Sequence, residues 1–219
     1  QVRTKMDAAK IAPMLVGATR ELLAGDTGSA KLGIQIASGF QLAELEGEVT
    51  TILQRDWAQA TEKAKSGDGK IVLSPQAEMA LRAMREMRGG DVALFAEIVK
   101  STATEANRNE ALAALASSKN ERGASVLLSL WPELNSQQRK TTLDRLVGSK
   151  AGAQAVVVAL KSGLIAKMDV HGAAFDKMQT VLGDSAELKE LMGDIAALFR
   201  PCLRLNGSDN AWAESDITL

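Results

Sequence analysis

Residues 81–95, LRAMREMRGGDVALF, show an arrangement of apolar residues that recurs twice more along the chain at a constant spacing. The second copy is LAALASSKNERGASV at 112–126, and the third is LDRLVGSKAGAQAVV at 143–157. Three columns of apolar residues keep this spacing: Leu81, Leu112 and Leu143; Met84, Leu115 and Leu146; Phe95, Val126 and Val157. One aligned column could arise by chance in a chain rich in Ala and Leu, but three together indicate an internal repeat.

The repeat predicts an all-α fold in which pairs of helices stack on one another. Two helices in about 30 to 45 residues are typical of an α-solenoid, because a single pair cannot bury its apolar face alone. The tetratricopeptide class is disfavoured because the chain has no Tyr, and the ankyrin class because no T-P-L-H motif occurs. We therefore predict a HEAT- or armadillo-like α-solenoid of stacked helix pairs over residues 1–200.

Local signals agree with this prediction, since strong helix formers dominate the first 200 residues. Apolar residues recur at spacings of three and four in two further stripes: Leu42, Leu45, Val49, Ile52 and Leu53; Leu188, Leu191, Met192, Ile195, Leu198 and Phe199. Four pairs of residues have the spacing of helix N-terminal caps: Ser74 with Pro75, Ser118 with Glu121, Asn135 with Gln138, and Asp184 with Glu187. Stop signals follow at Gly89-Gly90, Pro132, Gly148 and Gly183.

The pattern changes after residue 200. Pro201 ends the helical pattern, and Leu203 and Leu205 then alternate with polar neighbours before the turn signal Asn206-Gly207. We predict that residues 201–219 are the incomplete start of a β-sandwich, seen as one short strand and its turn. Such a segment is too short to form a sheet by itself.

Composition excludes several classes of chemistry. The chain has a single His, His171, and a single Cys, Cys202, which leaves no internal disulfide and no ordinary His/Cys zinc site. Lys and Arg number 26 against 27 Asp and Glu, so the net charge of -1 disfavours nucleic acid as a partner. No apolar run is long enough to span a membrane, and no signal peptide is visible. Both ends resemble cuts from a longer polypeptide.

The segment Ser66 to Lys70, SGDGK, invites two functional interpretations that its neighbours contradict. A phosphate-binding loop needs a glycine where Ala64 stands and a hydroxyl residue where Ile71 stands. A calcium-binding EF-hand loop would place Ala64 and Pro75 at positions that require carboxylates. We therefore expect a surface turn between helices.

Other residues with chemical potential are expected to have structural roles. His171 lies at a predicted helix start beside Asp169 and Asp176, without a nucleophile that would make it a general base. Cys202 is expected to be a half-buried apolar residue. The remaining candidates are expected to be salt-bridged surface or inter-repeat packing: Arg82, Arg85 and Arg88 with Glu78; Glu44, Glu46 and Glu48; Trp57 and Trp131 at helix ends. We predict no catalytic, cofactor-binding or metal-binding residue.

Two parts of the chain resemble a known family. LLSLWPELNSQQR at 127–139, LDRL at 143–146 and ALKSGLI at 159–165 resemble the HEAT-like region of the large haem-binding CxxCH multidomain proteins of planctomycete and verrucomicrobial type. CLRLNGSDNAWAESD at 202–216 is similar to the opening strand of the laminin-G/concanavalin-like domain that some members carry. No C-x-x-C-H occurs here, so no haem ligand of the family can be assigned to this chain. The resemblance implies a periplasmic or extracellular location.

Three functional hypotheses follow. The favoured one is a non-catalytic helical-repeat scaffold, without a cofactor of its own, that binds a protein partner or positions flanking domains of the same polypeptide. The alternative is a spacer within a haem-binding, electron-transfer or sugar-dehydrogenase-type enzyme, whose active modules lie outside this chain. A small helical enzyme built around Asp169, His171 and Asp176 is the least favoured.

Overall fold

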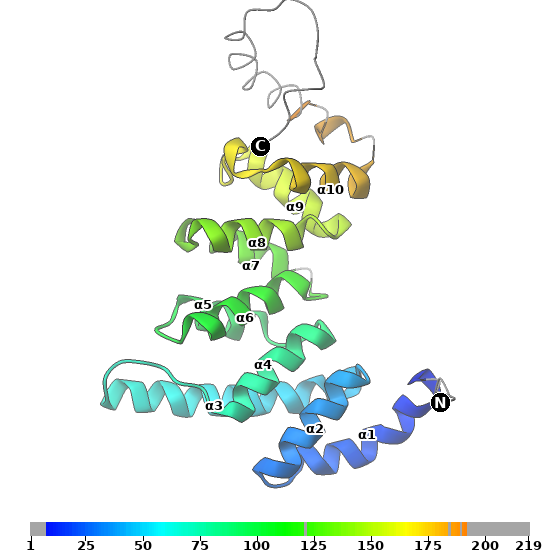
Figure 1. The fold of residues 1–219 in the computed structure, drawn as a ribbon, viewed down its shortest axis with the longest axis vertical. Helices are drawn as coiled ribbons and strands as arrows, with labels where there is room; N and C mark the ends of the chain where they lie inside the picture. The colour runs from blue at the N-terminus through cyan, green and yellow to red at the C-terminus, as the bar shows by residue number, and fades with distance from the viewer. Residues whose placement is uncertain (1–7, 121, 184, 189, 192–219) are drawn as a thin grey trace, which may run out of the picture.

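All the regular structure that is described is helical (Figure 1). The computed structural model describes residues 8–120, 122–183, 185–188 and 190–191. Its helices are α1 (Ala8–Ala24), α2 (Thr27–Gly39), η1 (Ala43–Leu45), α3 (Glu46–Ser66), α4 (Pro75–Met87), α5 (Val92–Lys100), α6 (Glu105–Ser117), α7 (Arg122–Ser129), η2 (Trp131–Glu133), α8 (Ser136–Leu146), α9 (Lys150–Lys161), η3 (Lys167–Asp169) and α10 (Gly172–Leu182), where η marks a 3-10 helix. These ranges hold no strand, so the all-α prediction is confirmed for them. The predicted β segment at 201–219 lies outside the described residues, as does Cys202.

The helices follow one another in chain order along the long axis of the molecule (Figure 1). One row is formed by α2, α4, α6 and α8, each of which packs against the next. A second row is formed by α5, α7 and α9, and α10 then packs on α9. The two rows are joined because α5 packs on α6, α6 on α7, and α8 on α9. Each of these helices therefore packs mainly on helices one or two places away in chain order.

The evenly spaced apolar columns supply much of the core. All members of the Leu81 and Met84 columns are buried, and in the third column only Val126 is half-buried. A fourth column with the same spacing, Ala103, Leu134 and Ile165, lies just after the second helix of each pair and is also buried. Burial of a Leu or Ile side chain stabilises a fold by about 1.5–3 kcal/mol, so these equivalent positions contribute in each pair.

Hydrogen bonds at the predicted caps fix where helices begin. The Ser74 hydroxyl accepts a hydrogen bond from the Ala77 N–H at 3.2 Å, which starts α4 as expected. Asn135 and Gln138 form a complete capping box at α8, with distances of 2.9 and 3.1 Å. Asp184 lies outside the described residues, so its predicted cap stays a prediction.

The predicted cap at Ser118 is wrong. Ser118 follows the end of α6, and its hydroxyl accepts the N–H of Asn120 at 3.0 Å. The side chain of Asn120 in turn accepts the N–H of Arg122 at 3.0 Å, and α7 begins there. A turn built from two short polar side chains thus replaces the single cap, because each side chain binds the backbone two residues ahead of it.

The two predicted tryptophan positions have different outcomes. Trp131 lies in η2 directly after α7 and is buried, as a helix-end packing residue should be. Trp57 lies in the interior of α3, so its expected place at a helix end is wrong. Its indole Nε1 donates to a carboxylate oxygen of Glu97 in α5 at 3.3 Å, which connects two helices far apart in the sequence. Of the helices described, none is sufficiently long and apolar to span a lipid bilayer.

Candidate functional site: a polar groove between α6 and α8

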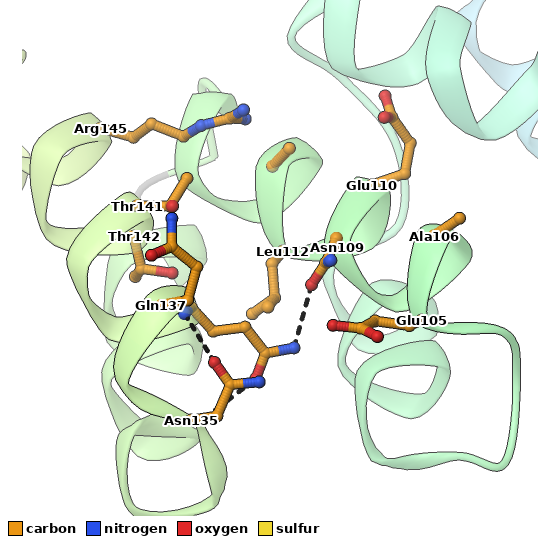
Figure 2. Close-up of a pocket in the computed structure, with 12 residues that line it drawn as sticks. Glu105, Ala106, Asn109, Glu110, Leu112, Asn135, Gln137, Thr141, Thr142 and Arg145 are labelled. Atoms are coloured by element: carbon orange, nitrogen blue, oxygen red, sulfur yellow. Dashed lines mark hydrogen bonds between the residues drawn. The ribbon is translucent and has the colours of Figure 1, made fainter.

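A groove of about 300 Å³ lies between α6 and α8 (Figure 2). Pockets that bind small ligands have volumes from roughly 300 to 1,000 Å³, so this one is at the small end of the range. Most of the residues that line it have polar side chains; the lining consists of Glu105, Ala106, Asn109, Glu110, Leu112, Ala113, Asn135, Gln137, Gln138, Thr141, Thr142 and Arg145. Its apolar side chains are the exposed Ala106 and the buried Leu112 and Ala113.

Asn135, the N-terminal cap of α8, lies at the lower end of the groove as Figure 2 draws it. Thr104 caps α6 by accepting the Asn107 N–H at 3.3 Å, and Asn135 caps α8 at the equivalent position of the next repeat copy. The two helices therefore begin at equivalent places in successive pairs. Since α6 packs against α8, their side chains face each other across the groove.

One side-chain hydrogen bond crosses from α8 to α6. The Gln138 Nε2 donates to Asn109 Oδ1 at 2.9 Å (Figure 2). The preceding pair of helices has the same contact: Asn107 Nδ2 on α6 donates to Glu78 Oε1 on α4 at 3.3 Å. Both bonds join residues 29 apart in sequence, and the two donors, like the two acceptors, occupy equivalent positions of successive copies. We call these two bonds the equivalent rungs.

One acidic residue of the groove is already paired with an arginine. Arg85 on α4 donates from Nη1 to Glu110 Oε2 at 3.1 Å, and the same nitrogen lies 2.9 Å from Oε1. Only one of these two contacts has hydrogen-bond geometry, since Oε1 is buried without such a bond. Glu110 therefore has a cation beside it before any ligand binds.

Arg145, Glu105 and Gln137 have no such partner. Within the described part of the chain, these three side chains make no hydrogen bond or ion pair, and all three are exposed. Figure 2 shows Arg145 and Glu105 at opposite ends of the groove. The groove thus presents one guanidinium, one carboxylate and one free amide to solvent, which is a set of groups for recognition by hydrogen bonds and charge.

The residues tested in the sequence for chemistry are placed elsewhere. The segment Ser66 to Lys70 begins with the last residue of α3 and continues as a surface turn, as expected; Asp68 accepts the Lys70 N–H there at 3.0 Å. It borders a second hollow of about 450 Å³. Among the described residues, no three His, Cys, Asp or Glu side chains lie together as a metal site.

His171 is a helix cap, as its position predicted. It precedes α10, and its Nδ1 accepts the Ala174 N–H at 3.3 Å. Its Nε2 lies 3.2 Å from Asp144 Oδ1 on α8, and this contact lacks hydrogen-bond geometry. The carboxylate beside the imidazole is therefore neither of the two that sequence proximity indicated, Asp169 and Asp176.

Arg82 and Arg85 in α4, and Arg88 directly after it, do not form one solvated face. Arg82 is exposed, whereas Arg85 pairs with Glu110 and Arg88 donates to the Ser117 carbonyl at 3.1 Å. Glu78, expected to pair with Arg82, accepts from α6 instead. Arg85, Arg88 and Glu78 therefore connect α4 and its C-terminal end to α6.

The cluster of acids before and in α3 likewise connects helices. Glu46 accepts the Gly90 N–H at 2.6 Å, in the turn between α4 and α5. Glu48 accepts from Arg20 Nε on α1 at 2.6 Å, and the hydrogen bond from Arg20 lowers the pKa of the Glu48 carboxyl. Glu44 is exposed. Of these three acidic residues, only Glu44 has the solvent-exposed surface position that was expected.

One further carboxyl has a lowered pKa, and it is also structural. Asp26 caps α2 by accepting the Ser29 N–H at 2.8 Å, and this hydrogen bond lowers the pKa of Asp26. Neither Asp26 nor Glu48 lines the groove.

Sequence reasoning did not single out the groove residues Asn109 and Arg145. The signal that could have found Arg145 is a comparison of the repeat copies, because the equivalent positions hold Ala83 and Ala114, which are both buried. A charged, exposed residue at a position that is otherwise a buried alanine does not serve the packing of the pair.

Comparisons of the chain with models of protein families, with curated proteins and with solved structures found no match.

Proposed function

We propose that this chain is a non-catalytic scaffold of the HEAT-like α-solenoid class, which binds a partner protein or holds flanking modules at a set spacing. The observation that carries the proposal is the pair of equivalent rungs. The same two positions of successive helix pairs form the same hydrogen bond, from Asn107 to Glu78 and from Gln138 to Asn109. When successive helix pairs stack with the same rotation and translation, the same side-chain contact is expected to recur once in each repeat.

The buried columns support the same proposal from the apolar side. Equivalent positions are buried in successive copies, and the helices pack mainly on helices one or two places away in chain order. Each pair is thus stabilised by the pairs before and after it, as in a linear array. The hydrogen bond of each rung contributes about 0.5–1.5 kcal/mol to stability. Because a hydrogen bond is directional, it also favours one relative orientation of the two helices.

The polar chemistry of the described residues is also that of a scaffold. Several of the charged groups described above cap helices or connect helices, as Glu46, Glu48 and His171 do. The groove offers hydrogen-bonding and charged groups without a paired nucleophile and base of the kind that acyl or phosphoryl transfer needs. Recognition, rather than bond making, is what such a surface supports.

A pair of deletions tests the stacking. Removing residues 112–142 joins Ala111 to Leu143 and keeps the register of the repeat, so the fused helix retains its apolar face. Removing residues 112–140 joins Ala111 to Thr141 and rotates the following residues by about 200° about the helix axis. We expect cooperative helical unfolding for the first variant and loss of it for the second, both measured by circular dichroism.

Spin labels test the role as a spacer. With Cys202→Ser as background, labels at the exposed positions Gln35 on α2 and Lys177 on α10 report the length of the stack. Neighbouring helices pack at roughly 8–10 Å, so the 112–142 deletion should shorten the distance by about that amount and keep its distribution narrow. A broad distance distribution in the full chain or in the 112–142 deletion would refute the scaffold. So would the same unfolding behaviour of the two deletion variants.

A further inference from the structure

The junction between α6 and α8 leaves two charged side chains unpaired, and in this it differs from the junction between α4 and α6. At the earlier junction, Arg85 pairs with Glu110 and Asn107 pairs with Glu78. At the later one, the rung from Gln138 to Asn109 forms, but Arg145 and Glu105 stay without a partner among the described residues. Exposed charges at both ends of a groove are free to bind a ligand.

The two charges stand on opposite walls. Arg145 projects from α8 and Glu105 from α6 (Figure 2). The rung places Asn109 level with Gln138; Glu105 is one turn before the rung, and Arg145 two turns after it. At 1.5 Å per helical residue, the charges are about 16 Å apart along the groove. An extended chain rises about 3.3 Å per residue, so roughly five residues cover that distance.

An extended ligand fits the two opposite walls when its two charged residues are separated by an odd number of positions. Successive side chains of an extended peptide point to opposite sides, so residues five apart face opposite walls. A carboxylate on one side can make a bidentate contact with the Arg145 guanidinium, and an ammonium or guanidinium on the other side can pair with Glu105. Between them, the free Gln137 amide and the Asn109 Nδ2 can bond the peptide main chain. Leu112 and Ala113 offer contact to a small side chain.

We propose that the groove between α6 and α8 binds an extended segment of a partner protein that carries an acidic and a basic residue about five positions apart. This inference rests on the proposed scaffold function and names the chemistry of its partner. The groove selects opposite charges in one ligand, because a polyanion would meet the unpaired Glu105 carboxylate and a polycation would meet Arg145.

A phage-displayed library of random 12-residue peptides, selected on the full chain, tests this proposal. We expect enriched peptides to carry the two charges at that spacing. Loss of a charge-assisted contact weakens binding by about tenfold, so Arg145→Gln and Glu105→Gln should each lower the affinity of a selected peptide by about that factor. The matched control is Lys140→Gln, an exposed cation on α8 that does not line the groove, and it should bind as the parent chain does.

Several outcomes would overturn the proposal. No enrichment over a bare surface, or equal binding by the Arg145→Gln and Lys140→Gln variants, would remove the groove as the site. Stronger binding after Glu105→Gln would indicate a polyanionic ligand instead and would also reject the peptide. The spin-label distances do not depend on the ligand, so they separate failure of this inference from failure of the scaffold itself.

Discussion

Gly152 marks a place where two helices approach each other too closely for any larger residue. It lies in the first turn of α9, next to the last residue of α8. A Cβ added there would lie 2.2 Å from the Leu146 carbonyl oxygen and 2.9 Å from the Ser149 hydroxyl that caps α9. Gly152→Ala therefore forces α9 away from α8, because a backbone atom cannot rotate aside.

The expected change in the free energy of unfolding is the sum of contributions with opposite signs. Alanine has a better helix propensity than glycine by about 0.5–1 kcal/mol. Overpacking costs about 1–3 kcal/mol, and a contact of 2.2 Å belongs at the upper end of that range. Displacement of the Ser149 hydroxyl also weakens a cap worth about 1 kcal/mol. We expect Gly152→Ala to lower the free energy of unfolding by about 2–3 kcal/mol.

Urea unfolding followed by circular dichroism measures this, with Gly17→Ala as the matched control. Gly17 lies within α1, is exposed, and has no atom within 4 Å of an added Cβ. The control should therefore be more stable than the parent chain by about 0.5–1 kcal/mol. If Gly152→Ala also proved neutral or stabilising, the close approach of α9 to α8 would be refuted.

Three further perturbations have defined outcomes. Leu143→Ala empties a fully buried column position and should cost about 2–5 kcal/mol in urea unfolding, whereas Val158→Ala, at an exposed site, should change stability by less than about 0.5 kcal/mol. Arg20 lowers the pKa of Glu48, so the stability from this pair is present above the ordinary carboxyl range and is lost as pH falls through the lowered pKa; Arg20→Gln should flatten the acid limb of a stability–pH curve, and an unchanged limb would refute the pairing. His171→Asn should keep the cap of α10, whereas His171→Ala should cost about 1 kcal/mol, seen as faster hydrogen exchange confined to that helix.

The helical class and much of the core were predictable because they depend on local spacing. Leu81, Leu112 and Leu143 lie on the same face of equivalent helices, and their constant period is visible without knowledge of the contacts. Asn135 and Gln138 were predictable for the same reason, since a capping box needs only four consecutive residues.

Features that depend on which helices lie side by side were not predictable. Glu46 matches a local acidic cluster, but its partner is the Gly90 N–H, 44 residues away. Asp144 approaches His171 only because α8 lies near the start of α10. Ser118 had the right spacing for a cap, yet competition from Asn120 moved the helix start, because short polar side chains can bind several nearby N–H groups.

The groove has some features that were predictable from spacing in the sequence and others that depend on which helices lie side by side. Its rung could be anticipated by aligning Asn107 with Gln138 and Glu78 with Asn109, but the hydrogen bond itself needs the distance between helices. Arg145 is visible as the exception in its column. The column does not reveal that Glu105 lies on the opposite wall at the other end of the groove, because these residues belong to different copies.

Arg145 also bears on how such an array could lengthen during evolution or by design. The equivalent alanines, Ala83 and Ala114, are buried in α4 and α6, whereas Arg145 lines the groove on the side of α8 that faces α6. A duplicated α8–α9 unit would therefore carry a guanidinium into its junction with the preceding copy, and close packing there would have to desolvate that charge. The array would lengthen with a charged groove at each added junction. A single Arg-to-Ala change would let the added helices pack as α4 and α6 do.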